Sequence, residues 1–339
     1  MSTDHTAYKT FNTPKLDRLL TFLASDEFVK KAGKLIKNFL VSVIAILLFL
    51  GLWSAGAKSV QTSLGQLPGP TKVWEQSVAL YDEHVQEREK EVAFYERQRL
   101  RNEKKLAKNP DAKVKIRPYT GKPTFFDQIV TSLYTVATGF VLASIIAIPI
   151  GIVCGMSQQL YQALNPIIQI FKPVSPLAWL PLVTMVVSAV YVSKDPMFEK
   201  SFVTSAITVT LCCLWPTIIN TTVGVSGVSK DLLNVSKVLR LGWFTKTVKI
   251  VLPSSIPMMF TGLRLSLGIG WMVLIAAEML AQNPGLGKFV WDEFQNGSSN
   301  SLARIMVAVL VIGALGFLLD RSMLMLQRRV SWDKSMVLR

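Results

Sequence analysis

The sequence predicts an all-α polytopic membrane protein with six transmembrane helices, and two observations lead to this fold class. Half of the 339 residues are hydrophobic and 17% are charged, whereas soluble domains carry about 25% charged residues. The apolar residues also gather in six stretches long enough, or nearly so, to cross about 30 Å of hydrocarbon. These stretches lie at about 39–57, 129–154, 166–192, 202–224, 256–280 and 302–324. The composition excludes a disordered chain, a collagen-like fibre and a small disulfide scaffold.

The N-terminal segment, residues 1–38, is polar and basic. The apolar run that follows, 39–57, is too long for the hydrophobic region of a signal peptide. We therefore expect no signal peptide, a cytoplasmic N-terminal segment and a first transmembrane helix over 39–57.

The next segment, 58–128, is the main candidate for a separate structural piece. Within it, residues 74–108 are rich in helix formers, densely charged and free of Gly and Pro. Glu87–Lys90 and Glu96–Arg99 are spaced to pair along a helix. We expect a periplasmic segment with a charged helical insertion over 74–122. It is interpreted either as a solvated helix on the outer surface or as a docking surface for an extracytoplasmic partner.

The remaining five spans form a predicted membrane core over 129–324, followed by a cytoplasmic tail, 325–339. Prolines interrupt the span at 166–192, and such a span is expected to line the bundle interior. Lys and Arg number 17 in the segments placed inside but 3 in the short loops placed outside. This asymmetry predicts that both termini are cytoplasmic, because Lys and Arg accumulate in cytoplasmic loops. The same rule accounts for the net charge of +15 without a nucleic-acid partner.

Catalytic and metal-binding motifs are absent from the sequence. It has two histidines, three cysteines, no CxxC pair and no GxxxxGK[ST] phosphate loop. We therefore expect a non-catalytic subunit with no metal and no cofactor of its own. If transport is driven by ATP, another chain must hydrolyse it.

The segment 229–252, between the fourth and fifth spans, is basic, amphipathic and followed by Pro253 and Pro257. A cytoplasmic helix of this kind lies either on the anionic leaflet or in the groove of a partner protein. The two interpretations stay open on this segment alone.

Here the sequence resembles the inner-membrane permease subunits of bacterial ABC importers. The Glu-Ala-Ala positions of their cytoplasmic signature fall on Asn234, Val235 and Ser236, and its Gly falls on Arg240, with Gly242 two residues later. This departure from the general signature looks like the variant signature of the nitrate, nitrite, cyanate and bicarbonate permeases. Six other stretches agree with that branch: 67–70, 176–181, 215–221, 260–264, 276–280 and 318–321.

The resemblance implies six helices of the importer permease type in the bacterial inner membrane and a mechanism of alternating access. It also implies a second permease subunit, expected to be a second copy, an ATPase subunit that binds ATP and Mg, and a periplasmic or lipid-anchored substrate-binding protein. A rigid amphipathic coupling helix over 231–247 would enter the ATPase. Its residues are Asp231, Leu232, Asn234, Val235, Ser236, Leu239, Arg240 and Gly242.

Nitrate is the substrate favoured by the degraded signature, which would place the chain in nitrate assimilation. The alternatives are bicarbonate, taurine or other aliphatic sulfonates, and a secondary anion transporter. Nitrate and bicarbonate have nearly the same shape and charge, so the choice between them is expected to reside in the binding protein.

The pore must offer positive or hydrogen-bond-donating groups to an anion. Candidates for the anion pathway are Arg264, Trp271, Asn220, Thr217 and Lys172. Arg264 is either a ligand of the anion, a member of a structural ion pair or a side chain that snorkels toward the lipid headgroups. Asn220 and Thr217 are either donors or helix-packing residues. Glu278 repels an anion and is expected to pair with a basic group on another helix or subunit.

Overall fold

The structure, a computed structural model, describes residues 26–62, 65–109, 114–192, 196–298 and 300–330. The chain divides into two compact units, 1–70 and 71–339. In the first unit, helix α2 (Asp26–Ser59) precedes two short antiparallel strands, β1 (Gln61–Thr62) and β2 (Gly65–Gln66). Residues 39–59 of α2 are long and apolar enough to cross a membrane. The helix begins 13 residues before the predicted span, and residues 1–25 of the predicted N-terminal segment lie outside the described part.

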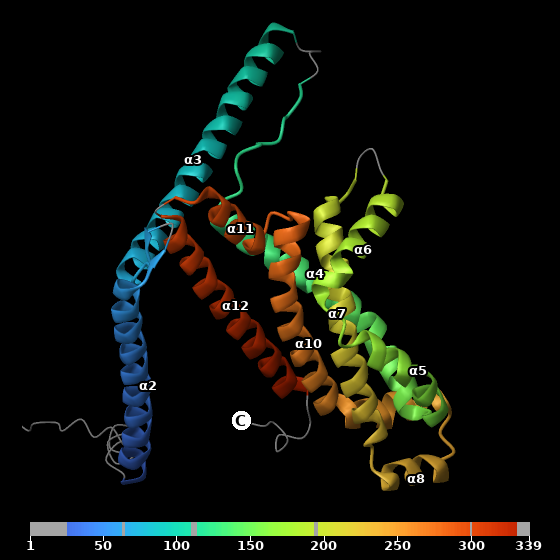
Figure 1. The fold of residues 1–339 in the computed structure, drawn as a ribbon. Helices are drawn as coiled ribbons and strands as arrows, with labels where there is room; N and C mark the ends of the chain where they lie inside the picture. The colour runs from blue at the N-terminus through green and yellow to red at the C-terminus, as the bar shows by residue number, and fades with distance from the viewer. Residues whose placement is uncertain (1–25, 63–64, 110–113, 193–195, 299, 331–339) are drawn as a thin grey trace, which may run out of the picture. The chain divides into compact units, whose positions relative to one another are not determined.

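The second unit is made almost entirely of helices in its described part (Figure 1). In chain order these are α3 (Pro70–Lys108), α4 (Phe125–Met156), α5 (Gln158–Phe171), α6 (Pro176–Val190), α7 (Lys200–Ser226), α8 (Lys230–Val238), α9 (Trp243–Lys246), the π-helix η1 (Thr247–Val251), α10 (Leu252–Ala281), α11 (Leu286–Asn296) and α12 (Ser301–Val330). Helix α12 therefore includes the first six residues of the predicted tail, and residues 331–339 are outside the described part.

Helix α7 lies at the centre of the unit, between α4 and α10. Oγ1 of Thr210 and Oγ1 of Thr222 donate to the carbonyls of Gly139 and Gly151, 71 residues earlier in both cases. This constant offset shows that α4 and α7 run parallel. A Cβ on Gly151 would lie 2.6 Å from Cβ of Thr221, so only glycine permits this approach. Small residues at such contacts are typical of helices that pack closely in membranes.

The predicted spans correspond to helices with one exception. Within the described part of the chain, five helical segments are long and apolar enough to cross a membrane: 39–59, 125–156, 200–226, 243–281 and 301–330. The predicted span over 166–192 is not one straight helix, because α5 and α6 form a pair that is bent by 98° at the break between them. Ser175 is extended and caps α6 just before Pro176. A residue that precedes proline avoids the helical conformation, and Pro173 has no N–H to continue α5.

Helix α3 differs from a helix that is solvated on all sides. Val73 and Leu80 are buried, and α3 leads away from the other helices toward its C-terminal end (Figure 1). The predicted pair Lys90–Glu87 is present at 3.3 Å, whereas Arg99 pairs with Glu103 instead of Glu96.

Candidate functional site

The connection between α7 and α10 is the first candidate site, because it presents apolar side chains to solvent. Ser229 caps α8 by accepting a hydrogen bond from the Leu232 amide. Ser236 is buried, and its Oγ donates to the Leu233 carbonyl at 2.6 Å. Leu233, on the same helix, packs against a small core of buried Val225, Val228 and Val251. One face of α8 is thus fixed to the bundle.

The opposite side of this connection is exposed. Of the eight predicted coupling residues, Ser236 is the buried one, and the other seven are exposed: Asp231, Leu232, Asn234, Val235, Leu239, Arg240 and Gly242. Exposed large apolar side chains continue beyond them at Val238, Trp243 and Phe244. An exposed group of apolar side chains of this size is typical of a protein interface.

The prediction of one rigid helix over 231–247 is wrong. Helix α8 ends at Val238, and Arg240 has φ of 51°. That left-handed conformation cannot continue a right-handed helix. Gly242 then precedes the short helix α9, and η1 leads into α10. The segment is a helix–turn–helix whose turn exposes Leu239.

Arg264 on α10 forms an ion pair with Asp320 on α12. Its Nε and Nη2 lie 3.0 and 2.9 Å from Oδ1 of Asp320, and Nη2 lies 3.2 Å from Oδ2. The two side chains are 32% and 45% exposed. Among the described residues, no group is bonded to Nη1, so the edge of the guanidinium formed by Nη1 and Nη2 keeps N–H groups free to donate. Arg264 is therefore a member of an ion pair, and its other N–H groups are still able to donate to an anion.

Glu278 is fully buried near the end of α10. Oγ of Ser132 lies 2.8 and 2.9 Å from its two carboxylate oxygens, and the Gly287 amide donates to it at 3.0 Å. The predicted basic partner is not among the described residues. Hydroxyl and amide donors take its place, because the turn between α10 and α11 folds over the carboxylate, where a Cβ on Gly285 would collide with it.

The other predicted pathway residues are dispersed. Thr217 is buried and hydrogen-bonded to Ser266 at 2.8 Å, and Nδ2 of Asn220 donates to the carbonyl of Pro216 at 2.8 Å. Nε1 of Trp271 donates to the Ile312 carbonyl on α12 at 3.0 Å, while Lys172 is exposed between α5 and α6. The structure thus places Trp271 and Arg264 between α10 and α12, and Thr217 and Asn220 between α7 and α10.

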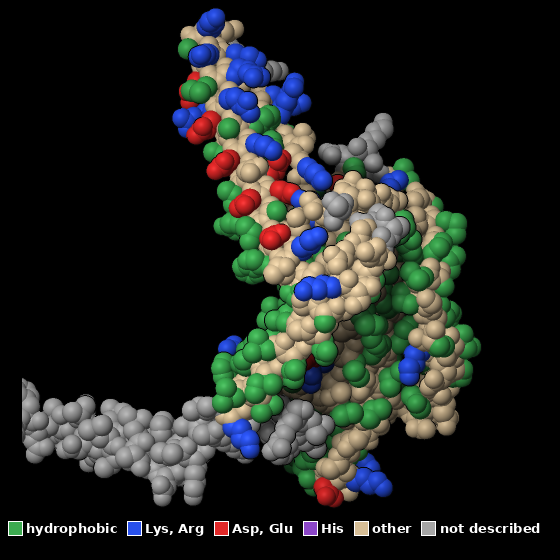
Figure 2. Space-filling view, turned by 60° about the vertical axis from the view of Figure 1, so that its left-hand side comes forward, with side chains coloured by type: hydrophobic (Ala, Val, Ile, Leu, Met, Phe, Trp, Pro, Cys, Tyr) green, Lys and Arg blue, Asp and Glu red, His purple; other side chains and the backbone are tan. Residues whose placement is uncertain are grey.

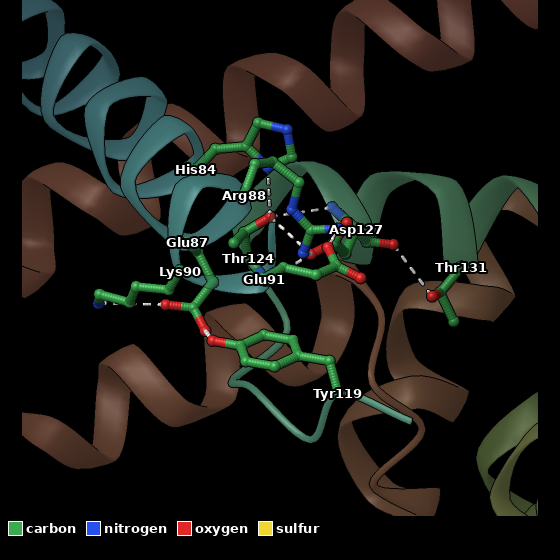
Figure 3. A network of polar contacts seen from close by, with 9 residues as sticks. All are labelled: His84, Glu87, Arg88, Lys90, Glu91, Tyr119, Thr124, Asp127 and Thr131. Carbon is green, nitrogen blue, oxygen red and sulfur yellow. Dashed lines mark hydrogen bonds and ion pairs between the residues drawn. The ribbon is translucent and has the colours of Figure 1, made fainter. Parts of the chain in front are cut away.

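A second polar site joins α3 to the start of α4 (Figure 3). Thr124 and Asp127 form a capping box at the start of α4, and Arg88 of α3 reaches Asp127 at 3.1 Å. Oη of Tyr119 donates to Glu87 at 2.7 Å. This hydrogen bond is the main cause that lowers the pKa of Glu87 and raises the pKa of Tyr119.

The partners of two predicted site residues, Arg264 and Glu278, were not identified from the sequence. Asp320 lies 56 residues after Arg264, and Ser132 lies 146 residues before Glu278. The available signal was weak: Asp320 is the one acidic residue in the apolar run 302–324. Within the described residues, no group of three or more His, Cys, Asp or Glu side chains is placed to hold a metal ion.

Comparison with known proteins gives concordant results. Over residues 147–332 the chain matches the family described as "Binding-protein-dependent transport system inner membrane component". The nitrate import permease protein NrtB of Leptolyngbya laminosa is 36% identical over 219 residues, 64% of this chain and 74% of the relative. The bicarbonate transport system permease protein CmpB of Synechococcus elongatus is 32% identical over 305 residues, 88% of this chain and 92% of the relative. The inward-facing MetNI methionine ABC transporter has the same fold, with a TM-score of 0.53 at 12% identity, over 61% of this chain and 96% of that chain.

Proposed function

The chain belongs to the family of binding-protein-dependent transport system inner membrane components, and from this premise we propose that it is the permease subunit of an ATP-driven importer of nitrate. It is a multi-pass inner membrane protein with the helical fold of ABC transporter permeases. The proposal assigns ATP and Mg to a separate ATPase subunit and delivery of the substrate to a soluble or lipid-anchored binding protein. A second copy of the chain completes the pore.

The observation that carries the substrate proposal is the half-occupied guanidinium of Arg264. Asp320 takes the Nε and Nη2 edge, and the edge formed by Nη1 and Nη2 has N–H groups free to donate. A planar guanidinium donates two parallel hydrogen bonds to a planar oxyanion. Nitrate has the required shape and charge, and α10 then holds the anion by the N–H donors of a guanidinium whose charge Asp320 already balances in part.

Space beside Arg264 supports the same proposal. Gly268 lies one turn further along α10, and a Cβ placed on it would meet nothing within 4 Å. Gly316 lies one turn before Asp320 on α12, and a Cβ there would come within 3.1 Å of the Trp271 ring. The two helices are therefore close at Trp271, and Gly268, which lies on the same face of α10 as Arg264, adds no side chain that would crowd a small anion next to the guanidinium.

For coupling, we assign the exposed turn after α8 to the ATPase interface. Leu232, Val235 and Leu239 provide its apolar contacts. The other side of α8 packs on the core that contains Val251, so a movement of α8 would move the bundle. This assignment also places both termini in the cytoplasm, as the Lys and Arg distribution supports.

Bicarbonate is the second candidate substrate, and the alignment with the bicarbonate permease, which spans 88% of this chain, favours it. Uptake by the complete transporter in proteoliposomes separates the two candidates. We expect ATP-dependent uptake of labelled nitrate, weak competition by bicarbonate and none by taurine. Transport of bicarbonate instead would keep the importer and overturn the substrate, whereas uptake that needs no ATPase would overturn the importer.

The Gly268→Leu variant tests the position of the anion. It fills open space, so we expect normal amounts of folded transporter with uptake reduced by about tenfold or more, as for a blocked hydrogen-bonding site. Leu265→Phe is the matched control, because Leu265 is 53% exposed on a neighbouring face of α10. Normal uptake in Gly268→Leu would contradict the proposed position of the anion beside Arg264.

A further inference from the structure

Helix α3 is rigidly mounted on the core through its N-terminal half. Arg304 on α12 pairs with both Glu83 on α3 and Glu293 on α11. Arg88 pairs with Asp127 on α4, as Figure 3 shows. The contacts of α3 come from two different elements of the core, α12 and α4, so α3 has a fixed direction and is not a loose loop.

The charges of α3 are segregated along its length. From Arg97 to Lys108 the helix has six basic residues and a single acidic one, Glu103, whereas the other seven acidic residues lie before Arg97. Figure 2 shows the acidic side chains along the lower part of the helix and the basic ones at its far end. If both termini are cytoplasmic, as proposed, this basic end lies outside the cell membrane, where the rule for cytoplasmic loops does not explain it.

The basic end contains a groove, which we call the α3 groove. It has a volume of about 430 Å³ and runs between α3 and the chain that returns toward α4. Gln98 fixes that chain with two hydrogen bonds to the backbone of Arg117, at 3.3 and 3.0 Å. No carboxylate lines the groove among the described residues. Its cations are Arg97, Arg101, Lys105, Lys115 and Arg117.

The strength of exposed charge pairs indicates what kind of ligand this groove holds. One exposed pair contributes about 0–1 kcal/mol, which is too little to retain a single monovalent anion against salt. Five cations can bind at the same time to a ligand surface that carries several acidic groups, and their contributions then add. Lys105 lies 17 residues beyond Arg88, which is about 26 Å along a helix. The groove thus lies far out along α3, which leads away from the core (Figure 1), where a soluble protein can reach it.

We infer that the α3 groove docks an acidic surface of the binding protein that delivers the substrate. The inference rests on the proposed function, because it names a partner of that importer. Charge complementarity of this kind mainly accelerates association and selects the partner. Helix α3 would then receive the binding protein at a fixed distance from the pore entrance.

The test uses the complete transporter in nanodiscs and the soluble binding protein of the same transport system. The double variant Arg101→Glu/Lys105→Glu reverses two charges in the groove. We expect its Kd for the binding protein to rise by roughly tenfold or more at low salt, since reversal replaces attraction by repulsion. The difference should shrink as salt is raised from about 50 mM to about 500 mM.

The matched control is Lys72→Glu/Arg99→Glu, which changes the net charge equally but lies outside the α3 groove. It should leave the Kd within about twofold of wild type, as expected for exposed charges outside the docking surface. An unchanged Kd in the groove variant, with ATP-dependent uptake intact, overturns the docking inference and leaves the proposed function standing. A raised KM for the free anion with an unchanged Kd would assign the groove to the anion and also overturn it. Absence of uptake in the wild type is a failure of the proposed function instead.

Discussion

Replacing Asp320 by Asn tests the proposed role of Arg264 most directly. The amide has nearly the shape of the carboxylate, and its oxygen still accepts from Nε and Nη2, which Asp320 now binds at 3.0 and 2.9 Å. The change therefore removes a negative charge while it keeps the geometry. If the free edge of the guanidinium binds an anion, that anion loses a repulsive neighbour.

The size of the effect follows from Coulomb's law. An anion on the opposite edge of the guanidinium lies about 7 Å from the Asp320 carboxylate, and at an effective dielectric of about 20–40 the repulsion is about 1–2 kcal/mol. Because the two side chains are 32% and 45% exposed, a dielectric of 4 does not apply. Removal of the charge should tighten anion binding by about five- to thirtyfold.

The assay is nitrate uptake by the complete transporter in proteoliposomes, with KM for the delivered anion and the maximal rate measured separately. We expect a lower KM in Asp320→Asn and a slower maximal rate, because tighter binding delays release. Breaking the half-exposed ion pair should also lower the free energy of unfolding by about 1–2 kcal/mol, between the values for exposed and buried pairs.

The companion variant Arg264→Lys keeps the charge but loses the planar fork, so it should raise KM. A KM within twofold of wild type in both variants would refute the proposed anion ligand. In that case the interpretation of Arg264 as a purely structural partner of Asp320 would hold.

Three further predictions concern the other sites. Leu239→Asp should abolish ATP-driven uptake at normal expression, because it puts a charge on the exposed turn proposed to contact the ATPase; co-purification of the ATPase measures the contact. Ser132→Ala removes a donor to the buried Glu278 carboxylate and should lower the free energy of unfolding by about 1–3 kcal/mol in detergent titrations. The Glu87–Tyr119 contact should weaken at acid pH: the folded pKa of Glu87 is lowered, so its contribution is present above the unfolded pKa and is lost as pH falls through the folded one. Amide exchange near Tyr119, relative to the intrinsic rate at each pH, measures that loss.

Each of these has a matched comparison. Leu239→Met keeps an apolar side chain and should retain uptake. Ser144→Ala removes a hydroxyl that bonds within its own helix, to Phe140, and should have little effect; equal losses in both serine variants would contradict the role given to Ser132. In Tyr119→Phe the amides near residue 119 should exchange rapidly at all pH values, relative to the intrinsic rate. If their protection still changed with pH in this variant, Glu87 would be excluded as the cause.

The sequence by itself determined the class of protein, most of the spans and the position of the amphipathic connection between α7 and α10. Hydropathy and helix formation depend on neighbouring residues, so runs such as 202–224 and 302–324 could be located directly and correspond to α7 and α12. The prolines at 166–192 marked an irregular span, but the angle of 98° between α5 and α6 was not available from them. The break at Arg240 was missed because amphipathic spacing continues across it.

Only the tertiary structure decided which polar groups meet. Asp320 finds Arg264 across 56 residues, and Ser132 finds Glu278 across 146. These pairings follow from how α4, α7, α10 and α12 pack, and that packing is set by many small steric fits such as Gly151 against Thr221. Local sequence fixes each helix because its hydrogen bonds close within four residues. The contacts between helices depend on the shapes of all the surfaces at once, and for that reason they emerged only from the folded chain.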